Sequence, residues 1–246
     1  MPIDDQELEA SRTRPPSGTA DGPTTWRGKN RPWWRQRWLT IAAGYSFAFL
    51  TGMAIAAALQ HSGGWHNGAR WERRLMLAMH VPLPAWFDAL VYASPWLGTN
   101  ITLIPGVLIG VWWLWRRARR PHLAMRLLIV QIGSYILNPA LKDLYDRPRP
   151  DLFERRGWYG WSSYPSGHAI ASIAVLFTVA LMLHRERGWR WPFYVLVPVS
   201  ALSLFSRVYL GVHWPTDVIA GTLVGAVWLL MTSIAFRDDS RGRDHE

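Results

Sequence analysis

The chain has 246 residues, half of them hydrophobic, and 17 are tryptophan. It contains no cysteine, which excludes disulfides and thiolate metal sites. The net charge of +10 is compatible with a nucleic-acid partner, but the cations cluster beside apolar runs. Many tryptophans flank those runs, as in the aromatic belts of membrane proteins. The composition therefore favours a membrane protein without a nucleic-acid partner.

Both ends of the chain are polar. Residues 1–32 are rich in Pro, Gly, Ser and Thr and have no apolar core, which predicts a disordered tail. This tail does not look like a signal peptide, because the first apolar run starts late and no small-residue cleavage pattern follows it. Residues 237–246 form a charged C-terminal tail. We expect a single membrane domain at 33–236.

Six apolar segments lie between the tails, and a helix needs roughly 20 apolar residues to cross a bilayer. They are residues 38–60, 97–115, 123–141, 167–183, 191–210 and 218–236. The mixed stretch 61–96 predicts short interfacial helices. The pattern as a whole predicts an all-α polytopic membrane protein with six transmembrane helices.

Lysines and arginines in short loops indicate which side of a membrane protein faces the cytoplasm. The basic segments 33–37, 116–120 and 184–190 alternate correctly to share that side. The connections 143–166 and 207–217 then lie outside, although arginines there weaken the rule unless they bind a substrate. We expect both termini in the cytoplasm, and the compact form of the chain favours a bacterial inner membrane.

Three stretches at the outer ends of the predicted helices combine charged and catalytic residue types. The first runs from Lys142 to Pro150, the second is Pro165-Ser166-Gly167-His168, and the third runs from Ser206 to Asp217. Charged groups in a membrane are costly and tend to be functional. Arginine presents a planar, two-pronged donor set to phosphate, and a helix N-terminus favours a bound anion. The three stretches together therefore predict an anion site.

Each of these residues alone has an ordinary explanation. Lys142 and the arginines can reach lipid headgroups, His168 can be a polar residue at a helix start, and Ser166 can be an N-cap. His213 and Asp217, four residues apart, can form a satisfied pair on one helix face. A metal site of two histidines and one carboxylate is the competing interpretation. The surrounding positive charge argues against it, so we expect no metal ion.

The three stretches resemble the signature of the type 2 phosphatidic acid phosphatase superfamily. The matched pattern is Lys, six residues, Arg-Pro; then Pro-Ser-Gly-His; then Ser-Arg, five residues, His, three residues, Asp. These motifs cover residues 142–217, and the six-span layout extends the similarity to most of the chain after residue 38. Soluble acid phosphatases and vanadium haloperoxidases carry the same signature, and the spans here favour the membrane branch.

The resemblance implies a role for each matched residue. His213 would attack phosphorus and form a phosphohistidine, while Asp217 fixes its tautomer. His168 would protonate the leaving oxygen and then activate water. The phosphoryl oxygens would be held by Lys142, Arg149, Arg207 and the backbone at Gly167, with assistance from Ser166 and Ser206. The resemblance implies no cofactor.

A site at the ends of membrane helices can accept a headgroup while the lipid tail stays in the bilayer. The expected substrate is a lipid phosphate or diphosphate, and the family offers undecaprenyl diphosphate, phosphatidic acid, phosphatidylglycerol phosphate and lipid A phosphates. Carrier-lipid recycling is our first hypothesis. Two alternatives are a lipid-phosphate binding or transport protein and a vanadate-dependent oxidase. The sequence indicates no obligate protein partner.

Two further patterns have competing interpretations. An aromatic run precedes the second stretch and is either a headgroup lid or an interfacial belt, and we favour the belt. It consists of Trp158, Tyr159, Trp161 and Tyr164. Gly221 and Gly225 form a close-packing pair, for which we prefer packing within the monomer to a dimer interface.

Overall fold

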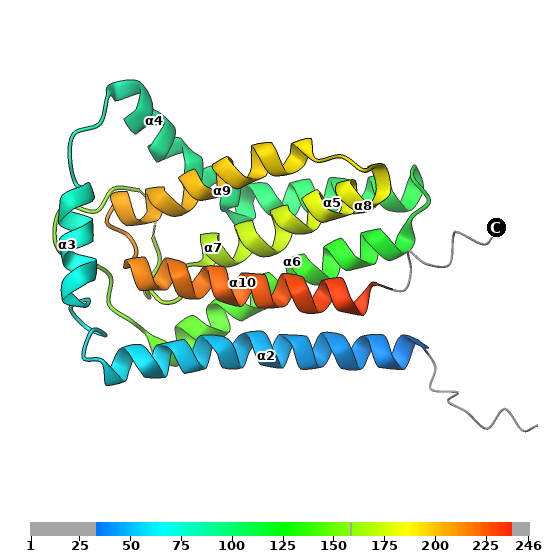
Figure 1. The fold of residues 1–246 in the computed structure, drawn as a ribbon, viewed down its shortest axis with the longest axis horizontal. Helices are drawn as coiled ribbons and strands as arrows, with labels where there is room; N and C mark the ends of the chain where they lie inside the picture. Colours follow the sequence, from blue (N-terminus) through cyan, green and yellow to red (C-terminus); the bar gives the residue numbers. More distant parts are fainter. Residues whose placement is uncertain (1–32, 158, 238–246) are drawn as a thin grey trace, which may run out of the picture. The chain divides into compact units, whose positions relative to one another are not determined.

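The computed structural model of the chain describes residues 33–157 and 159–237. The predictions for the tail 1–32, for Trp158 and for 238–246 lie outside these residues. Within them the chain consists of helices and turns and contains no strand (Figure 1). The helices are α2 (Trp33–His61), α3 (Arg70–Met79), α4 (Ala85–Ala93), the short η1 (Ser94–Gly98), α5 (Asn100–Arg116), α6 (Pro121–Tyr145), α7 (Gly167–Ala171), the π-helical η2 (Ser172–Leu176), α8 (Phe177–Arg187), α9 (Trp191–Tyr209) and α10 (Pro215–Ala235). The all-α prediction is confirmed for this part of the chain.

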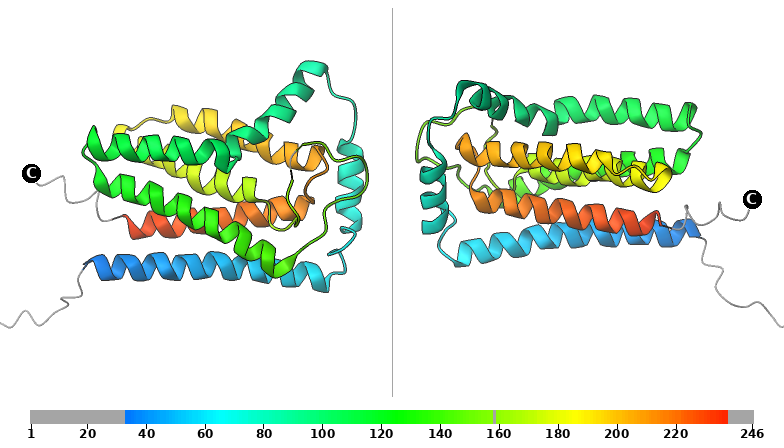
Figure 2. Two further views of the ribbon diagram at one scale, coloured as in Figure 1. Left: turned by 180° about the vertical axis from the view of Figure 1, so that it is seen from behind. Right: turned by 45° about the horizontal axis from the view of Figure 1, so that its top comes forward.

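The long helices lie side by side, with α2 packed along α10 and α5 along α6 (Figures 1 and 2). Helix α3 crosses one end of these helices, where α2, α6 and α9 end and α7 and α10 begin. The basic turns between α5 and α6 and between α8 and α9 lie at the opposite end. The motif stretches and the basic turns are therefore separated by the length of the helices.

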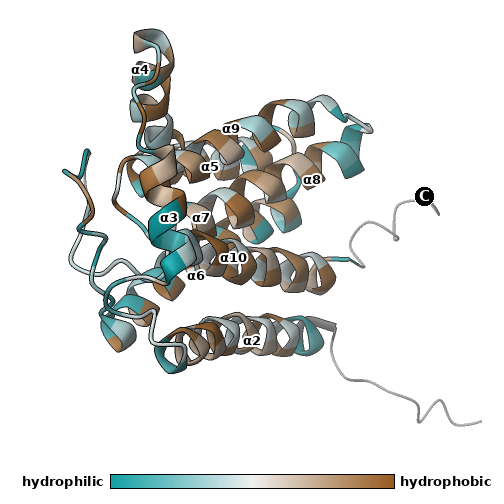
Figure 3. Cartoon of the chain, turned by 60° about the vertical axis from the view of Figure 1, so that its left-hand side comes forward, coloured by the Kyte–Doolittle hydropathy of each residue, from teal (hydrophilic) through white to brown (hydrophobic). Residues whose placement is uncertain are grey.

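Five uninterrupted helical runs are long and apolar enough to span a membrane, and together with one bent helix pair they define an integral membrane protein. The five are α2, α6, the run from α7 through α8, α9 and α10. The bent pair is Ala85–Gly98 with Asn100–Arg116, which meet at 51°. Residues 85–96 were expected to be interfacial, but they form most of the first arm of this pair. The hydropathy colouring of Figure 3 shows apolar stretches along the long helices and hydrophilic residues on α3.

The core between the long helices is apolar and closely packed. Trp228 of α10 is buried, and its indole N–H donates to the carbonyl of Val130 at 3.1 Å. Gly133 of α6 makes room for this ring, because a Cβ there would lie 2.3 Å from it. On the outside, large side chains such as Leu108 and Ile109 remain exposed. Contact with lipid explains such an apolar surface, since hydrocarbon does not penalise it.

The two glycines of α10 face the start of α7. A Cβ on Gly221 would lie 2.4 Å from the backbone carbonyl oxygen of Ser166, and one on Gly225 would lie 2.8 Å from that of Ile170. The predicted packing within the monomer is confirmed. The two helices approach closely because neither glycine has a side chain.

The aromatic run does not behave as one belt. Tyr164 is fully buried, and its hydroxyl donates to the carbonyl of Gly52 at 2.6 Å. The belt interpretation is wrong for this residue, because it anchors the connection after α6 to α2. Trp161 is exposed, and Tyr159 lines the cavity described below.

The connection after α6 is also tied to α4 and α9. The guanidinium of Arg156 donates two hydrogen bonds to the carboxylate of Asp88, at 2.6 and 3.0 Å. These bonds raise the pKa of Arg156. The backbone N–H of Arg156 donates to the carbonyl of Leu210 at 3.0 Å. These contacts fix the path of the connection over the end of the helices.

Candidate active site

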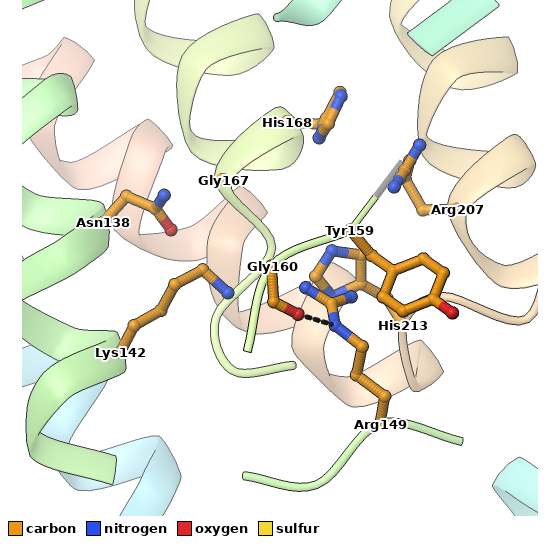
Figure 4. Close-up of a pocket in the computed structure, with 9 residues that line it drawn as sticks. All are labelled: Asn138, Lys142, Arg149, Tyr159, Gly160, Gly167, His168, Arg207 and His213. Atoms are coloured by element: carbon orange, nitrogen blue, oxygen red, sulfur yellow. Dashed lines mark hydrogen bonds between the residues drawn. The ribbon is translucent and has the colours of Figure 1, made fainter. Parts of the chain in front are cut away.

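A cavity of about 400 Å³ opens at the end of the helices that α3 crosses. It is lined by Asn138, Lys142, Arg149, Tyr159, Gly160, Gly167, His168, Arg207 and His213 (Figure 4). Six of the eight predicted site residues belong to this list, and the other two, Ser166 and Asp217, lie behind the wall. The three motif stretches therefore converge on one cavity.

Backbone carbonyls hold two of the cavity's cations in place. The ammonium of Lys142 donates to the carbonyl of Ser162 at 2.6 Å, and a guanidinium nitrogen of Arg149 donates to the same oxygen at 2.8 Å. Arg149 also donates from Nε to the carbonyl of Gly160 at 2.8 Å, as Figure 4 shows, and from Nη1 to that of Val212. These carbonyl partners carry no formal charge, so no carboxylate neutralises either side chain through these bonds.

The cations lie deep in the protein. Lys142 and Arg207 are buried, and they come from the ends of α6 and α9. Burial lowers the pKa of Arg149 to about 10, an effect that Asp217 opposes and Arg155 reinforces. Arg149 thus stays protonated at neutral pH. Three basic side chains around one cavity attract a phosphoryl group strongly.

His213 belongs to the turn between α9 and α10. Its backbone N–H donates to the carbonyl of Arg207 at 3.2 Å, and its ring is buried. The pKa of His213 is lowered well below its usual value by burial first and then by the positive charges of Arg149, Lys142 and Arg207. The imidazole is therefore neutral at physiological pH, the form in which a ring nitrogen has a free lone pair.

The pairing of His213 with Asp217 differs from the one expected on a helix face. Helix α10 starts at Pro215, so the histidine precedes it and only the carboxylate lies on it. The Nδ1 atom of His213 is 3.7 Å from Oδ2 of Asp217, beyond hydrogen-bond distance. Because Nδ1 faces the carboxylate, the other ring nitrogen, Nε2, is the one suited to attack.

Asp217 is fully buried and is held by other groups. Its Oδ1 accepts a hydrogen bond from Arg147 at 2.6 Å. Its Oδ2 accepts from the hydroxyl of Ser163 and, at 2.9 Å, from the backbone N–H of Trp214. Its backbone carbonyl accepts from the N–H of Ser166 at 3.0 Å, which links α10 to the start of α7.

The start of α7 is the predicted anion-binding helix end. Gly167 and His168 line the cavity. Ser166 occupies the N-cap position of α7, but its hydroxyl makes no capping bond and does not line the cavity. Gly167 is pressed against Asn138, because a Cβ there would lie 2.6 Å from the amide nitrogen. The π-helical turn of η2 follows directly, and such turns often occur at functional sites.

The two remaining predictions concern Ser206 and a metal ion. The hydroxyl of Ser206 donates to the carbonyl of Ser203 at 2.6 Å, away from the cavity lining. In the part of the chain that the structure describes, no three His, Asp or Glu side chains are grouped to hold a metal ion. Asp217 faces Arg147 and His213. The competing metal-site interpretation, in which His168, His213 and Asp217 bind one ion, therefore has no common point for that ion.

Sequence reasoning missed five residues of the site, one of which is Gly160 in the connection after α6. Asn138 precedes Lys142 by one helical turn, so the i, i+4 spacing on α6 would have placed both on one face. Arg147, Ser163 and Glu72 had no such signal, since they reach Asp217 or its partners from connections and from α3.

The fold and the cavity define an integral membrane protein with a cationic site that contains two histidines. The family model of the PAP2 superfamily matches residues 123–241. Phosphatidylglycerophosphatase B of Bacillus subtilis is 32% identical over 183 residues, which cover 72% of this chain and 87% of that protein. The chain belongs to the PAP2 superfamily.

Two further similarities are more limited in extent or in identity. Undecaprenyl-diphosphatase of Sulfolobus acidocaldarius is 46% identical over 72 residues, covering 29% of this chain and 32% of that protein. The crystal structure of a transmembrane PAP2 type phosphatidylglycerolphosphate phosphatase from Bacillus subtilis matches with a TM-score of 0.65 at 23% identity, over 82% of this chain and 98% of that chain. The structural likeness supports the same fold.

Proposed function

We propose that the chain is a lipid phosphatase that hydrolyses a lipid phosphate or diphosphate through a phosphohistidine. The observation that carries this proposal is the convergence of His213, His168 and three cations on one cavity at the end of membrane-spanning helices. A headgroup at this depth leaves its lipid tail beside the helices. The catalytic domain is residues 33–236.

In the first step, Nε2 of His213 attacks phosphorus and the bond from phosphorus to the leaving oxygen breaks. His168 donates a proton to that oxygen. Asp217 stabilises the imidazolium that forms. In the second step, His168 takes a proton from water, the water oxygen bonds to phosphorus, and the P–N bond breaks, which releases phosphate and restores His213.

The negative charge of the transferring phosphoryl group is stabilised by Lys142, Arg149 and Arg207, together with backbone N–H groups at Gly167. Substrate candidates follow from the names of the two relatives above, phosphatidylglycerol phosphate and undecaprenyl diphosphate. Of these two we favour undecaprenyl diphosphate. Phosphatidic acid and lipid A phosphates are further candidates to be assayed.

The site faces the extracytoplasmic side of a bacterial inner membrane, and both termini are cytoplasmic. The basic turns at 116–120 and 184–190 support this orientation, because they lie at the end opposite the cavity. Labelling of single cysteines introduced at Arg74 and Arg117 tests it. Only the first should react with an impermeant reagent added to spheroplasts, and the reverse pattern contradicts the orientation.

The decisive experiment is phosphate release from lipid phosphates and diphosphates by purified protein in detergent with excess chelator. The His213→Ala variant serves as the blank. Release that survives chelation and vanishes in the blank supports the proposal. Binding without release points to a lipid-phosphate binding or transport protein, and halide oxidation with added vanadate points to an oxidase.

A further inference from the structure

Arg147 has every hydrogen-bond donor of its guanidinium engaged inside the protein. Nε donates to the carbonyl of Trp65 at 3.0 Å, and Nη2 donates to the carbonyl of Gly64 at 2.9 Å. The remaining donors reach Thr216 at 2.7 Å, Asp217 at 2.6 Å and Glu72 at 3.3 Å. The side chain is fully buried. Arg147 therefore has no donor left for a phosphate, unlike Arg149 two residues later.

Glu72 connects this arginine to α3. One carboxylate oxygen accepts from Arg147 and, at 2.7 Å, from the backbone N–H of Ala69. The other accepts from both the backbone N–H and the hydroxyl of Thr216, at 3.1 and 2.5 Å. Glu72 thus satisfies a free N–H group in the first turn of α10, a position that normally needs a capping partner.

Glu72, Arg147, Thr216 and Asp217 form what we call the carboxylate network. It holds two negative charges and one positive charge, and its three charged side chains are completely buried. Burying ions is costly unless each is paired and hydrogen-bonded, and a stabilising role alone is often served as well by apolar residues. The net negative charge lies beside His213, through the 3.7 Å approach of Asp217.

We propose that Glu72 and Arg147 are positioning residues that fix Asp217 and, through it, the orientation and basicity of His213. This inference rests on the proposed nucleophilic role of His213. Arg147 holds the carboxylate in place by Oδ1 and leaves Oδ2 directed toward the ring. Glu72 offsets the charge of Arg147, so that Asp217 keeps a negative field at the histidine.

Charged groups from several elements act on His213, and the test has to separate them. Lys142 of α6, Arg149 of the following connection, His168 of α7 and Arg207 of α9 surround the cavity side. The carboxylate network lies on the other side, with Asp217 of α10 nearest. Changing Glu72 leaves the lining of the cavity as it is, because Glu72 does not line the cavity.

The test compares Glu72→Gln, which removes the charge, with Glu72→Asp, which keeps it. Loss of a negative charge near an imidazole lowers its pKa. We expect Glu72→Gln to lower kcat at least tenfold with KM within twofold of wild type, and to move the acid limb of kcat/KM to lower pH. Glu72→Asp should leave the acid limb in place. An unmoved limb and an unchanged kcat in Glu72→Gln would overturn the proposal.

The Asp88→Asn variant is the matched control. It removes the charge from another carboxylate–arginine contact of this region, the one with Arg156, and leaves the hydrogen bonds of Asp217 in place. Its acid limb should match wild type. An equal shift in Asp88→Asn would mean that the effect is a general loss of packing, which contradicts the proposal.

If Glu72→Gln does not fold, Thr216 provides a second route that leaves every charge intact. Its hydroxyl joins Glu72 to Arg147. Thr216→Val, which lacks the hydroxyl, should have a lower kcat, and Thr216→Ser, which keeps it, should have the kcat of wild type. A wild-type kcat in Thr216→Val would overturn the proposal. Activity remaining in His213→Ala is a separate result, since it refutes the proposed function rather than the network.

Discussion

The Nδ1 atom of His213 lies 3.7 Å from Oδ2 of Asp217, and that oxygen already accepts hydrogen bonds from Ser163 and Trp214. The resting pair is thus close but not hydrogen-bonded, and catalytic hydrogen bonds often tighten only when substrate binds. A positive charge developing on the imidazole would draw the two groups together.

The first prediction concerns this carboxylate. Asp217→Asn keeps the shape of the side chain but removes the charge that stabilises the imidazolium. We expect kcat to fall by up to about 10⁴, the loss known for the same change in a serine-protease histidine–aspartate pair. Initial rates of phosphate release measure it. Asp143→Asn, an exposed acid beside Lys142, is the control and should keep wild-type rates.

The second prediction is a pH dependence. Burial and the three nearby cations lower the pKa of His213, so it stays neutral and nucleophilic at pH values where an ordinary histidine is protonated. The acid limb of kcat/KM should therefore lie below pH 6.5. A limb at or above that value would contradict the lowered pKa.

The same shift affects stability. The folded state binds fewer protons at His213 than the unfolded chain, so this residue lowers the free energy of unfolding as the pH falls below the unfolded pKa of about 6.5. Thermal unfolding in detergent between pH 7 and pH 5 measures this loss. His213→Gln should show a smaller loss over that interval, and an equal loss would rule out His213 as its source.

The third prediction concerns the cations. Lys142→Ala and Arg207→Ala should each cost about 2 to 4 kcal/mol of transition-state stabilisation, or roughly 30- to 1,000-fold in kcat/KM. Arg74→Ala removes an exposed arginine outside the cavity and should stay within twofold. If the two cavity variants behave like Arg74→Ala, the cations only anchor headgroups.

The fourth prediction uses two glycines in transmembrane helices. Gly221→Ala would place a methyl group 2.4 Å from the carbonyl oxygen of Ser166, so α10 and α7 must separate. We expect a loss of about 1 to 3 kcal/mol in stability, together with lower activity, because Ser166 directly precedes the helix that carries His168. Gly106→Ala meets open space and should lower neither. Unfolding temperature and initial rate check both.

The convergence of the three stretches was predictable because each lies at the end of an apolar segment on the same side of the membrane. The 3.6-residue period of a helix then predicts the face of α6 on which residues such as Lys142 lie. The contacts around Asp217 were not predictable, because Arg147 and Glu72 reach it from a connection and from α3. The local hydrophobic period of a sequence does not indicate how the connection after α6 and helix α3 cross the end of the long helices.

The bend between α4 and α5 has a similar cause. Residues 85–98 are mostly apolar but too few to cross a bilayer alone, and Pro95 and Gly98 lie in the short η1 segment that joins them to α5. The packing of η1 against α9 accompanies this bend. The hydrophobic pattern of the sequence does not show this packing between distant segments, so it does not predict the bend.

The carbonyl oxygens of Ser162, Gly160 and Val212 act as resting partners for Lys142 and Arg149. These carbonyls occupy only some of the donors of the two side chains, so an incoming phosphate can accept from the donors that remain. A phosphate monoester, with nearly two negative charges, gains more from these contacts than a phosphodiester with one. We therefore expect the site to bind a lipid phosphate monoester in preference to the phosphodiester lipids that surround it, before any bond is broken.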